Sequence, residues 1–258
     1  MKARRFGTAL ALLSVTVAAA HKDPSSQPFP LRHGMLRGSA ETVEGPRPCD
    51  WCDLFVDDVG NLVVSLLDVR SSAESTERFA ATLVRDTRSA LVSHQALHSV
   101  VNALELQLAT FPGVEVALVV LRMSQRDAKV EVLNAGMPAV ANAGPGRLEL
   151  YPALSSPVGR RVGEVHPYEL VPLAWGTTWL SVSDGMVNGS LDPENVTALC
   201  ARLDLARCGP ALAAQTSDEL YGSFQVLLSS TRFLRDDATA VVVTADPSAR
   251  FQSGIDRT

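Results

Sequence analysis

Basic runs are missing from this chain of 258 residues, and lysine is nearly absent. The lysines are Lys2, Lys22 and Lys129, so arginine supplies almost all of the positive charge, and the net charge is -5. A protein that binds nucleic acid needs a basic surface to neutralise phosphates. The composition therefore argues against a nucleic-acid-binding protein, and the shortage of lysine carries no functional information by itself. The chain also lacks a G-x-G-x-x-G motif, a Walker loop and any internal repeat.

Four cysteines are present, but their spacing does not indicate a structural zinc site. Cys49 and Cys52 form a C-x-x-C motif, whereas Cys200 and Cys208 are too far apart to make the second close pair. A thioredoxin-like redox motif would open a helix after a strand. Here the hairpin-turn signal Asp57-Asp-Val-Gly-Asn61 follows instead. An exported thiol–disulfide protein stays a minor alternative.

The N-terminus has the pattern of a secretory signal. Lys2, Arg4 and Arg5 precede an uncharged run over residues 6–20 that ends in three alanines. The run is shorter than the ~20 residues that span a bilayer as a helix. A buried N-terminal element of a cytoplasmic protein would show the same pattern, so export, a membrane anchor and a cytoplasmic location all stay open.

Length and composition predict one large domain with terminal appendages. Hydrophobic residues make up 46% of the chain, which supports a large core. Residues 21–48 are rich in Pro, Ser, Gly and His, a composition typical of a linker. We therefore divide the chain into an N-terminal hydrophobic segment with a linker (1–44), a folded domain (45–246) and a C-terminal tail (247–258).

Aspartates lie where strand-like hydrophobic runs begin or end. Asp68 follows the run 61–67, and Asp184 follows the run 177–183. Converging carboxylates repel one another unless a hard divalent cation binds them through oxygen. The pattern therefore indicates a metal-dependent hydrolase. The other aspartates of this kind are Asp50 and Asp53, and the pair Asp236–Asp237 before residues 238–244.

Hydrophobic periodicity predicts strands and helices in separate blocks. Apolar residues at helical spacing predict two packed helices over residues 72–111, with a capping-box signature at Ser71 and Glu74. Further helices are predicted over residues 193–206 and 210–232. Because the elements do not alternate as βαβ units, we predict an α+β layered sandwich with antiparallel sheets. The predicted strands cover residues 54–56, 62–67, 114–123, 128–133, 139–142, 147–151, 165–171, 177–183 and 238–244.

In order along the chain, six segments resemble the motifs of the metal-dependent protein phosphatases of the PPM type, in the SpoIIE/RsbU-like branch. That branch shows G-G-D-x-x-D, D-V-S-G-x-G, A-G-H-P, P-L-G, T-D-G and D-D-I-T. The resemblance covers about residues 45–245 and implies an α-β-β-α sandwich of two antiparallel sheets flanked by helices. The counterparts in this chain are Pro48–Asp53, Asp68–Ala73, Ala135–Pro138, Pro157–Gly159, Ser183–Gly185 and Asp236–Thr239.

The resemblance also implies a reaction and its cofactors. In this family, aspartates bind two divalent cations, Mn²⁺ or Mg²⁺. A water between the metals attacks the phosphorus of phosphoserine or phosphothreonine. The cations lower the pKa of that water and stabilise the charge of the transition state, so no protein nucleophile is needed.

The ligands implied by this resemblance fall on seven positions. Asp68 would be the central ligand, with the Val69 carbonyl beside it. Asp50 would bind one metal, and Asp184 would help to complete the site of the other. These three aspartates are the implied catalytic residues. The full set of implied ligands is Asp50, Asp53, Asp68, Val69, Asp184, Asp236 and Asp237.

Each aspartate also has a structural alternative. Asp50 and Asp53 could cap a turn, and Asp68 could be the N-cap of the following helix. Asp184 stands before a glycine, which is an ordinary turn dipeptide. The pair Asp236–Asp237 could be exposed without a role.

Two motifs depart from the family pattern at their glycines. G-G-D is replaced by Pro48-Cys-Asp50, and D-V-S-G-x-G by Asp68-Val-Arg-Ser-Ser-Ala73. Glycine permits close backbone approach and positive φ near the metals, and Arg70 adds a charge beside the site. Met137 replaces the usual His. The retained acids favour an active phosphatase over an inactive relative.

We therefore expect a protein-serine/threonine phosphatase with two divalent cations. By resemblance, its substrate would be a small phosphorylated regulator similar to an anti-anti-sigma factor. Its location would be cytoplasmic, in contrast to the exported pattern of residues 1–20. The alternatives are a catalytically silent domain of this fold that binds a regulatory partner, and the exported thiol–disulfide protein that uses Cys49 and Cys52.

Overall fold

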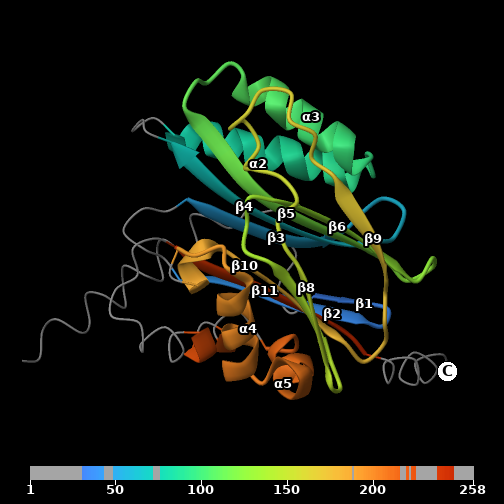
Figure 1. Cartoon of the computed structure of the whole chain (residues 1–258). Coiled ribbons are helices and arrows are strands. Elements are labelled where there is room, and N and C mark those ends of the chain that lie inside the picture. Colours follow the sequence, from blue (N-terminus) through green and yellow to red (C-terminus); the bar gives the residue numbers. More distant parts are fainter. Residues whose placement is uncertain are drawn as a thin grey trace, which may run out of the picture.

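Two antiparallel β-sheets lie face to face between two layers of helices in the computed structural model (Figure 1). This arrangement confirms the predicted α+β sandwich. The expected N-terminal hydrophobic segment, the C-terminal tail and Asp236 lie outside the described residues. The structure describes residues 31–43, 49–71, 76–187, 189–215, 219–220, 222–224 and 237–246.

The first sheet has five strands in the order β3-β4-β5-β6-β9. Helices α2 (Thr76–Val92) and α3 (Leu97–Leu108) cover its outer face (Figure 1). Apolar side chains of the sheet, such as Phe55, Val63 and Leu118, pack against these helices in one core cluster. The strands are β3 (Asp50–Val56), β4 (Leu62–Ser71), β5 (Val114–Ser124), β6 (Lys129–Ala135) and β9 (Tyr168–Pro172).

The second sheet has six strands in the order β1-β2-β11-β10-β7-β8. Helices α4 (Pro193–Arg202) and α5 (Leu205–Leu212) cover its outer face (Figure 1). A 3-10 helix, η1 (Asp184–Val187), follows β10. The strands are β1 (Leu31–His33), β2 (Leu36–Val43), β7 (Val140–Gly144), β8 (Arg147–Tyr151), β10 (Thr178–Val182) and β11 (Ala238–Ala245).

A third apolar cluster fills the space between the two sheets. Alternate residues of each strand point to this inner face, because side chains in a strand alternate with period two. Leu54 and Leu66 from the first sheet meet Trp179 and Val243 from the second. Trp179 is fully buried and is among the largest such side chains in the described residues. This inner core holds the two sheets together.

The linker predicted over residues 21–48 is wrong for residues 31–43, which form β1 and β2. Strand β2 pairs along its whole length with β11, so it belongs to the second sheet. Its small residues are there for close packing, since a Cβ on Gly38 would lie 2.7 Å from the Leu54 side chain. A segment with a composition typical of a linker is therefore a buried strand.

The helix predicted over residues 193–206 is confirmed for residues 193–202, but it ends earlier than predicted. The chain forms α4 and α5, with a break at Asp204, whose φ of 46° lies in the left-handed region. Strand β4 runs to Ser71, past the predicted end at Leu67. Among the described residues, no helix is both long enough and apolar enough to span a membrane.

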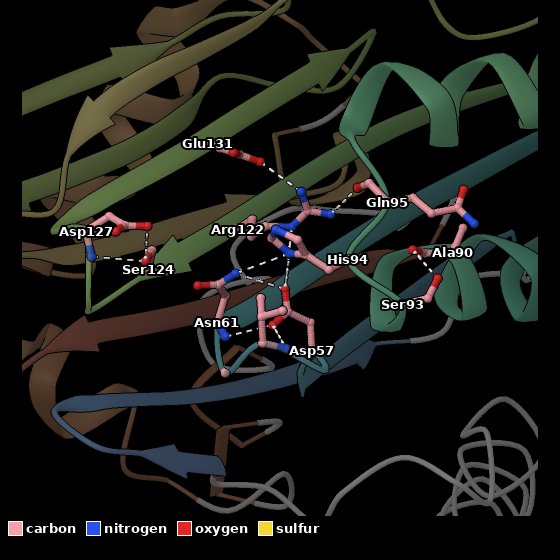
Figure 2. Close-up of polar contacts among 12 residues, drawn as sticks. Asp57, Asn61, Ala90, Ser93, His94, Gln95, Arg122, Ser124, Asp127 and Glu131 are labelled. Carbon is pink, nitrogen blue, oxygen red and sulfur yellow. Dashed lines mark hydrogen bonds and ion pairs between the residues drawn. The ribbon is translucent and has the colours of Figure 1, made fainter.

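A buried polar network closes the end of the first sheet where β3 turns into β4 (Figure 2). The side chain of Asp57 accepts hydrogen bonds from the Asn61 backbone amide at 2.8 Å and the Asn61 side-chain amide at 3.0 Å. His94, in the turn between α2 and α3, lies 2.8 Å from the same carboxylate. Arg122 of β5 donates to Glu131 at 3.0 Å and to the Gln95 carbonyl at 2.7 Å. The network thus ties both turns to the sheet.

We predict that Asp57→Asn destabilises the domain by about 1–3 kcal/mol at neutral pH, because buried donors lose a charged acceptor. Burial raises the pKa of Asp57, but hydrogen bonds from Asn61 and His94 outweigh it and hold the pKa below its ordinary value. Because the folded-state pKa is lowered, the carboxylate stabilises the fold above the pKa of the unfolded chain. This contribution is lost as pH falls through the folded-state pKa. The difference between variant and native protein should therefore shrink below about pH 4.

Urea denaturation across this pH range measures the effect. Asp58→Asn is the matched control, since Asp58 is the exposed neighbour in the same turn and should change stability by less than about 0.5 kcal/mol. Equal losses for both variants would contradict a role of the network in stability.

Candidate metal centre

Two buried carboxylates lie directly opposite each other at one end of the first sheet. Asp50 begins β3 and is paired in register with Asp68 of β4. Both side chains point to the inner face, toward the second sheet, and their residues are 4% and 0% exposed. The register of one pair of strands therefore forces two acids together out of contact with water.

The second sheet supplies contacts to Asp50. The Thr239 hydroxyl of β11 donates to Asp50 Oδ2 at 2.8 Å. Asp237, just before β11, accepts hydrogen bonds from the backbone amides of Cys49 at 2.8 Å and Asp50 at 3.3 Å. These bonds fix the start of β3 against the start of β11, so polar contacts join the sheets at this end.

Arg70 lies between Asp68 and a third acid, Asp184. Its Nε donates to Asp68 Oδ2 at 2.6 Å, and its Nη2 donates to Asp184 Oδ2 at 2.8 Å. Asp184 opens η1 directly after β10, so it comes from the second sheet. One guanidinium thus bridges carboxylates from both sheets.

The pKa values reflect crowding of negative charge. Burial and the neighbouring Asp68 charge raise the pKa of Asp50 well above its usual range. Burial raises the pKa of Asp68 to about 6, even though Arg70 opposes the shift. Burial lowers the pKa of Arg70, but the charges of Asp68 and Asp184 outweigh it and raise that pKa. Ionising these acids so close together in a buried site therefore costs free energy.

The glycine after Asp184 is required by the close approach of two chain segments. A Cβ on Gly185 would overlap the carbonyl oxygen of Asp237. Ser183 lies at the same contact, where its hydroxyl accepts a hydrogen bond from the Thr239 amide at 2.9 Å. The D-G dipeptide thus brings Asp184 and the start of β11 together.

Asp53 is not brought to this cluster. It lies three residues after Asp50 in β3, so alternation turns its side chain to the opposite face of the sheet. There its carboxylate pairs with Arg88 of α2, whose guanidinium lies 4.8 Å from the ring centroid of Phe55. The structure therefore does not place Asp53 behind Asp50 at the candidate metal site, which corrects the prediction.

The other predicted ligands differ in where the structure places them. Asp237 reaches the cluster, where its carboxylate holds backbone amides. Val69 directly follows Asp68, and its amide donates to the Cys49 carbonyl at 2.9 Å. Asp236 lies outside the described residues. Met137, which stands where the family carries His, is fully buried in the inner apolar core.

Sequence patterns did not identify two further side chains near the acids. The Cys49 thiol and one carboxylate oxygen each from Asp50 and Asp68 all lie within 4.8 Å of one another. Thr239 was part of a matched motif, but only the pairing of the sheets shows that its hydroxyl reaches Asp50. The four cysteines form no disulfide. Cys52 lies near Thr42, with its sulfur 3.8 Å from the hydroxyl, and burial raises the pKa of its thiol to about 12.

The side chains present fit a divalent cation. Asp68 Oδ1 is buried and has no hydrogen-bond partner of normal geometry among the described residues, while its Oδ2 is paired with Arg70. Carboxylate oxygens are the ligands that hard divalent cations prefer. An unsatisfied buried carboxylate oxygen beside a second acid is costly without such a cation. The arrangement can therefore bind metal and position an anionic substrate next to it.

Comparison with known proteins identifies a family for this chain. The SpoIIE family (stage II sporulation protein E) matches residues 58–246, which leaves Asp50 outside the matched stretch. Among curated proteins, none matches the chain.

Solved structures of three bacterial proteins show a similar fold. The RsbU and RsbW domains of Rv1364c from Mycobacterium tuberculosis have a TM-score of 0.65 at 19% identity, over 82% of this chain and 60% of that one. The PP2C phosphatase domain of SpoIIE from Bacillus subtilis, with a fragment of its regulatory domain, has a TM-score of 0.62 at 16% identity, over 82% and 62%. The SiaA-PP2C domain of Pseudomonas aeruginosa has a TM-score of 0.63 at 14% identity, over 80% and 86%. The chain thus spans about three fifths of the length of the first two.

We predict that Asp50→Asn stabilises the metal-free protein and that Asp53→Asn destabilises it. Asp50 has no ion pair among the described residues and faces Asp68, and its pKa is raised by burial and by that neighbour. At a pH where both acids are ionised, removing its charge therefore relieves repulsion, with a gain of about 0.5–2 kcal/mol. Asp53 is paired with the nearly buried Arg88, so its neutral variant should lose about 1–3 kcal/mol.

Urea denaturation in the presence of EDTA measures both variants under the same conditions. The two substitutions are chemically identical and lie three residues apart on one strand, so each controls for the other. A loss for Asp50→Asn as large as that for Asp53→Asn would contradict the repulsion between Asp50 and Asp68.

Proposed function

The chain belongs to the SpoIIE family and has the fold of PP2C-type phosphatase domains, and we propose that it is a metal-dependent phosphatase that hydrolyses phosphoserine or phosphothreonine of a regulatory protein. The observation that carries the proposal is the convergence of Asp50, Asp68 and Asp184. These acids come from three separate parts of the chain and meet at one end of the sandwich. A cluster that costs stability is typical of a site retained for its chemistry.

Four aspartates would hold the cations in this proposal. Asp68 is the ligand nearest to both sides of the cluster, Asp50 lies on one side of it and Asp184 on the other. Asp236 would join Asp184, as the family pattern implies. When bound, Mn²⁺ or Mg²⁺ would lower the pKa of the attacking water and neutralise charge on the phosphoryl oxygens.

The protein's own contribution is to hold these acids in place. Thr239 and Asp237 fix the position of Asp50, through its side chain and its backbone respectively. Arg70 orients Asp68 and Asp184. Its side chain is one-third exposed, and a guanidinium matches the geometry of phosphate oxygens. Arg70 is therefore placed to contact a phosphoryl group that enters the site.

A phosphorylated regulatory protein is the proposed substrate. The structural relative from M. tuberculosis contains RsbU and RsbW domains in one protein. An anti-anti-sigma-like phosphoprotein acting in the cytoplasm is the partner that this relationship favours.

A second candidate is a catalytically silent domain that binds such a partner. The specific observation in its favour is Arg70, which already neutralises charge between Asp68 and Asp184. In that case the guanidinium would replace a cation permanently, and the site would bind phosphoprotein without hydrolysis.

We predict that the full chain hydrolyses p-nitrophenyl phosphate with Mn²⁺ and loses this activity in EDTA. Asp68→Ala and Asp184→Ala should each lower the rate by about 100-fold or more, because groups that stabilise transition-state charge have effects of this size. Asp58→Ala is the control, since Asp58 lies in the exposed turn at the other end of β3 and should leave the rate unchanged. If Mn²⁺ binds but no hydrolysis of this ester or of phosphopeptides follows, the silent domain is the better interpretation.

We further predict that Arg70→Ser strengthens Mn²⁺ binding to the metal-free protein. The guanidinium competes with a cation for Asp68 Oδ2 and Asp184 Oδ2, so its removal should lower the dissociation constant by about 10-fold, or about 1.4 kcal/mol. Isothermal titration calorimetry measures this change. Arg85→Ser, in an exposed arginine of α2, is the matched control and should have no effect. Unchanged or weaker Mn²⁺ binding by Arg70→Ser would show that Arg70 does not compete with the metal.

A further inference from the structure

The acid cluster includes a thiol, that of Cys49, at a position where the family pattern has glycine. Cys49 stands where the G-G-D motif carries its second glycine. Its Sγ and one carboxylate oxygen each from Asp50 and Asp68 lie within 4.8 Å of one another. A single ion can bridge ligand atoms at such separations, because metal–oxygen and metal–sulfur bonds are about 2.0–2.3 Å long. Among the described residues, this is the one group of three such side chains close enough to share an ion.

A second, independent observation points to a cation at the same place. Asp68 is fully buried, and its Oδ1 has no hydrogen-bond partner of normal geometry among the described residues. Arg70 satisfies only Oδ2. The Cys49 thiol lies beside this carboxylate, but a thiol is a weak donor. A cation would satisfy this buried carboxylate oxygen more fully than a thiol hydrogen does.

The backbone holds Cys49 in position for this role. Its amide donates to Asp237 Oδ2 at 2.8 Å, and its carbonyl accepts from the Val69 amide at 2.9 Å. The residue is thus fixed on both sides, by the start of β11 and by the strand that carries Asp68. A ligand on a rigid backbone loses little entropy when it binds an ion.

We propose that Cys49 is a metal ligand together with Asp50 and Asp68, and that this site takes a thiophilic divalent cation of the zinc class in preference to Mg²⁺. Thiolate sulfur binds zinc-like ions well, whereas Mg²⁺ requires oxygen ligands. On binding, the thiol releases its proton to solvent and the thiolate takes its place on the metal, with no oxidation or reduction. The inference rests on the proposed function, since it names the cation on the Cys49 side of the same centre.

Cys52 provides a matched control within the same C-x-x-C motif. Its side chain lies near Thr42 and packs against the core between the sheets. It is not one of the side chains that could share an ion with Asp50 and Asp68. Cys52→Ala therefore removes a thiol three residues away without removing a ligand.

The test is titration of the chelator-treated full chain with Co²⁺, a spectroscopic substitute for Zn²⁺. We expect a thiolate-to-cobalt charge-transfer band in the near ultraviolet that Cys52→Ala retains and Cys49→Ser abolishes. By calorimetry, Cys49→Ser should weaken Zn²⁺ binding by at least about 10-fold, the smallest effect expected even for a partner outside the ligand set. Mg²⁺ binding should change little. Cys49→Gly, which restores the family residue, repeats the test if the serine variant does not fold.

Three results would overturn the proposal: Co²⁺ bound without the band, a band that persists in Cys49→Ser, or equal loss of Zn²⁺ binding in both cysteine variants. The outcome is separable from that of the proposed function. Mn²⁺-dependent hydrolysis without the cobalt–thiolate band would leave the phosphatase intact and reject the sulfur ligand. A cobalt–thiolate band without phosphatase activity would support the sulfur ligand and reject the enzyme.

Discussion

Repulsion between the buried carboxylates of Asp50 and Asp68 is the constraint on which this end of the molecule depends. The register of β3 and β4 places the two acids face to face, and the sheet above them excludes water. The compensating contacts come from two parts of the chain, the end of β4 and the start of β11. Arg70 pairs with Asp68, Thr239 donates to Asp50, and Asp237 holds the backbone at the start of β3. Apolar packing joins the sheets elsewhere, whereas polar contacts join them at this end.

Because side chains alternate between the two faces of a strand, Asp50 and Asp53 of β3 have different roles. Asp50 points to the junction between the sheets, whereas Asp53 points to the helix layer and pairs with Arg88. A sequence motif of two aspartates three residues apart suggests one site, but three is an odd number of steps along a strand. The first acid is available to a metal, and the second attaches α2 to the sheet. Asp50 faces another acid, whereas Asp53 faces an arginine, so the two aspartates lie in opposite electrostatic environments.

The fold was largely predictable because long hydrophobic runs mark most of the strands. Residues 31–43 were missed because Gly38 and its small neighbours pack closely between strands, and such residues also resemble a linker. The convergence of Asp50, Asp68 and Asp184 followed from the order of the motifs. The position of Asp53 and the proximity of Cys49 did not, since both depend on which face of the sheet a side chain occupies.

Ser71 stands where the family has a glycine three residues after Asp68, and this replacement affects where the side chain of Arg70 lies. With Ser71 in place of the family glycine, β4 stays paired with β5 as far as Ser71 and Val114. Glycine at that position would favour a turn or a break in the strand. In an extended strand, residues two apart share a face, so Arg70 must lie on the same face as Asp68. From there its guanidinium reaches Asp184 on the other sheet. The departure from the family pattern thus gives this chain an internal positive charge at its acid cluster, and any metal that binds there must share the carboxylates with it.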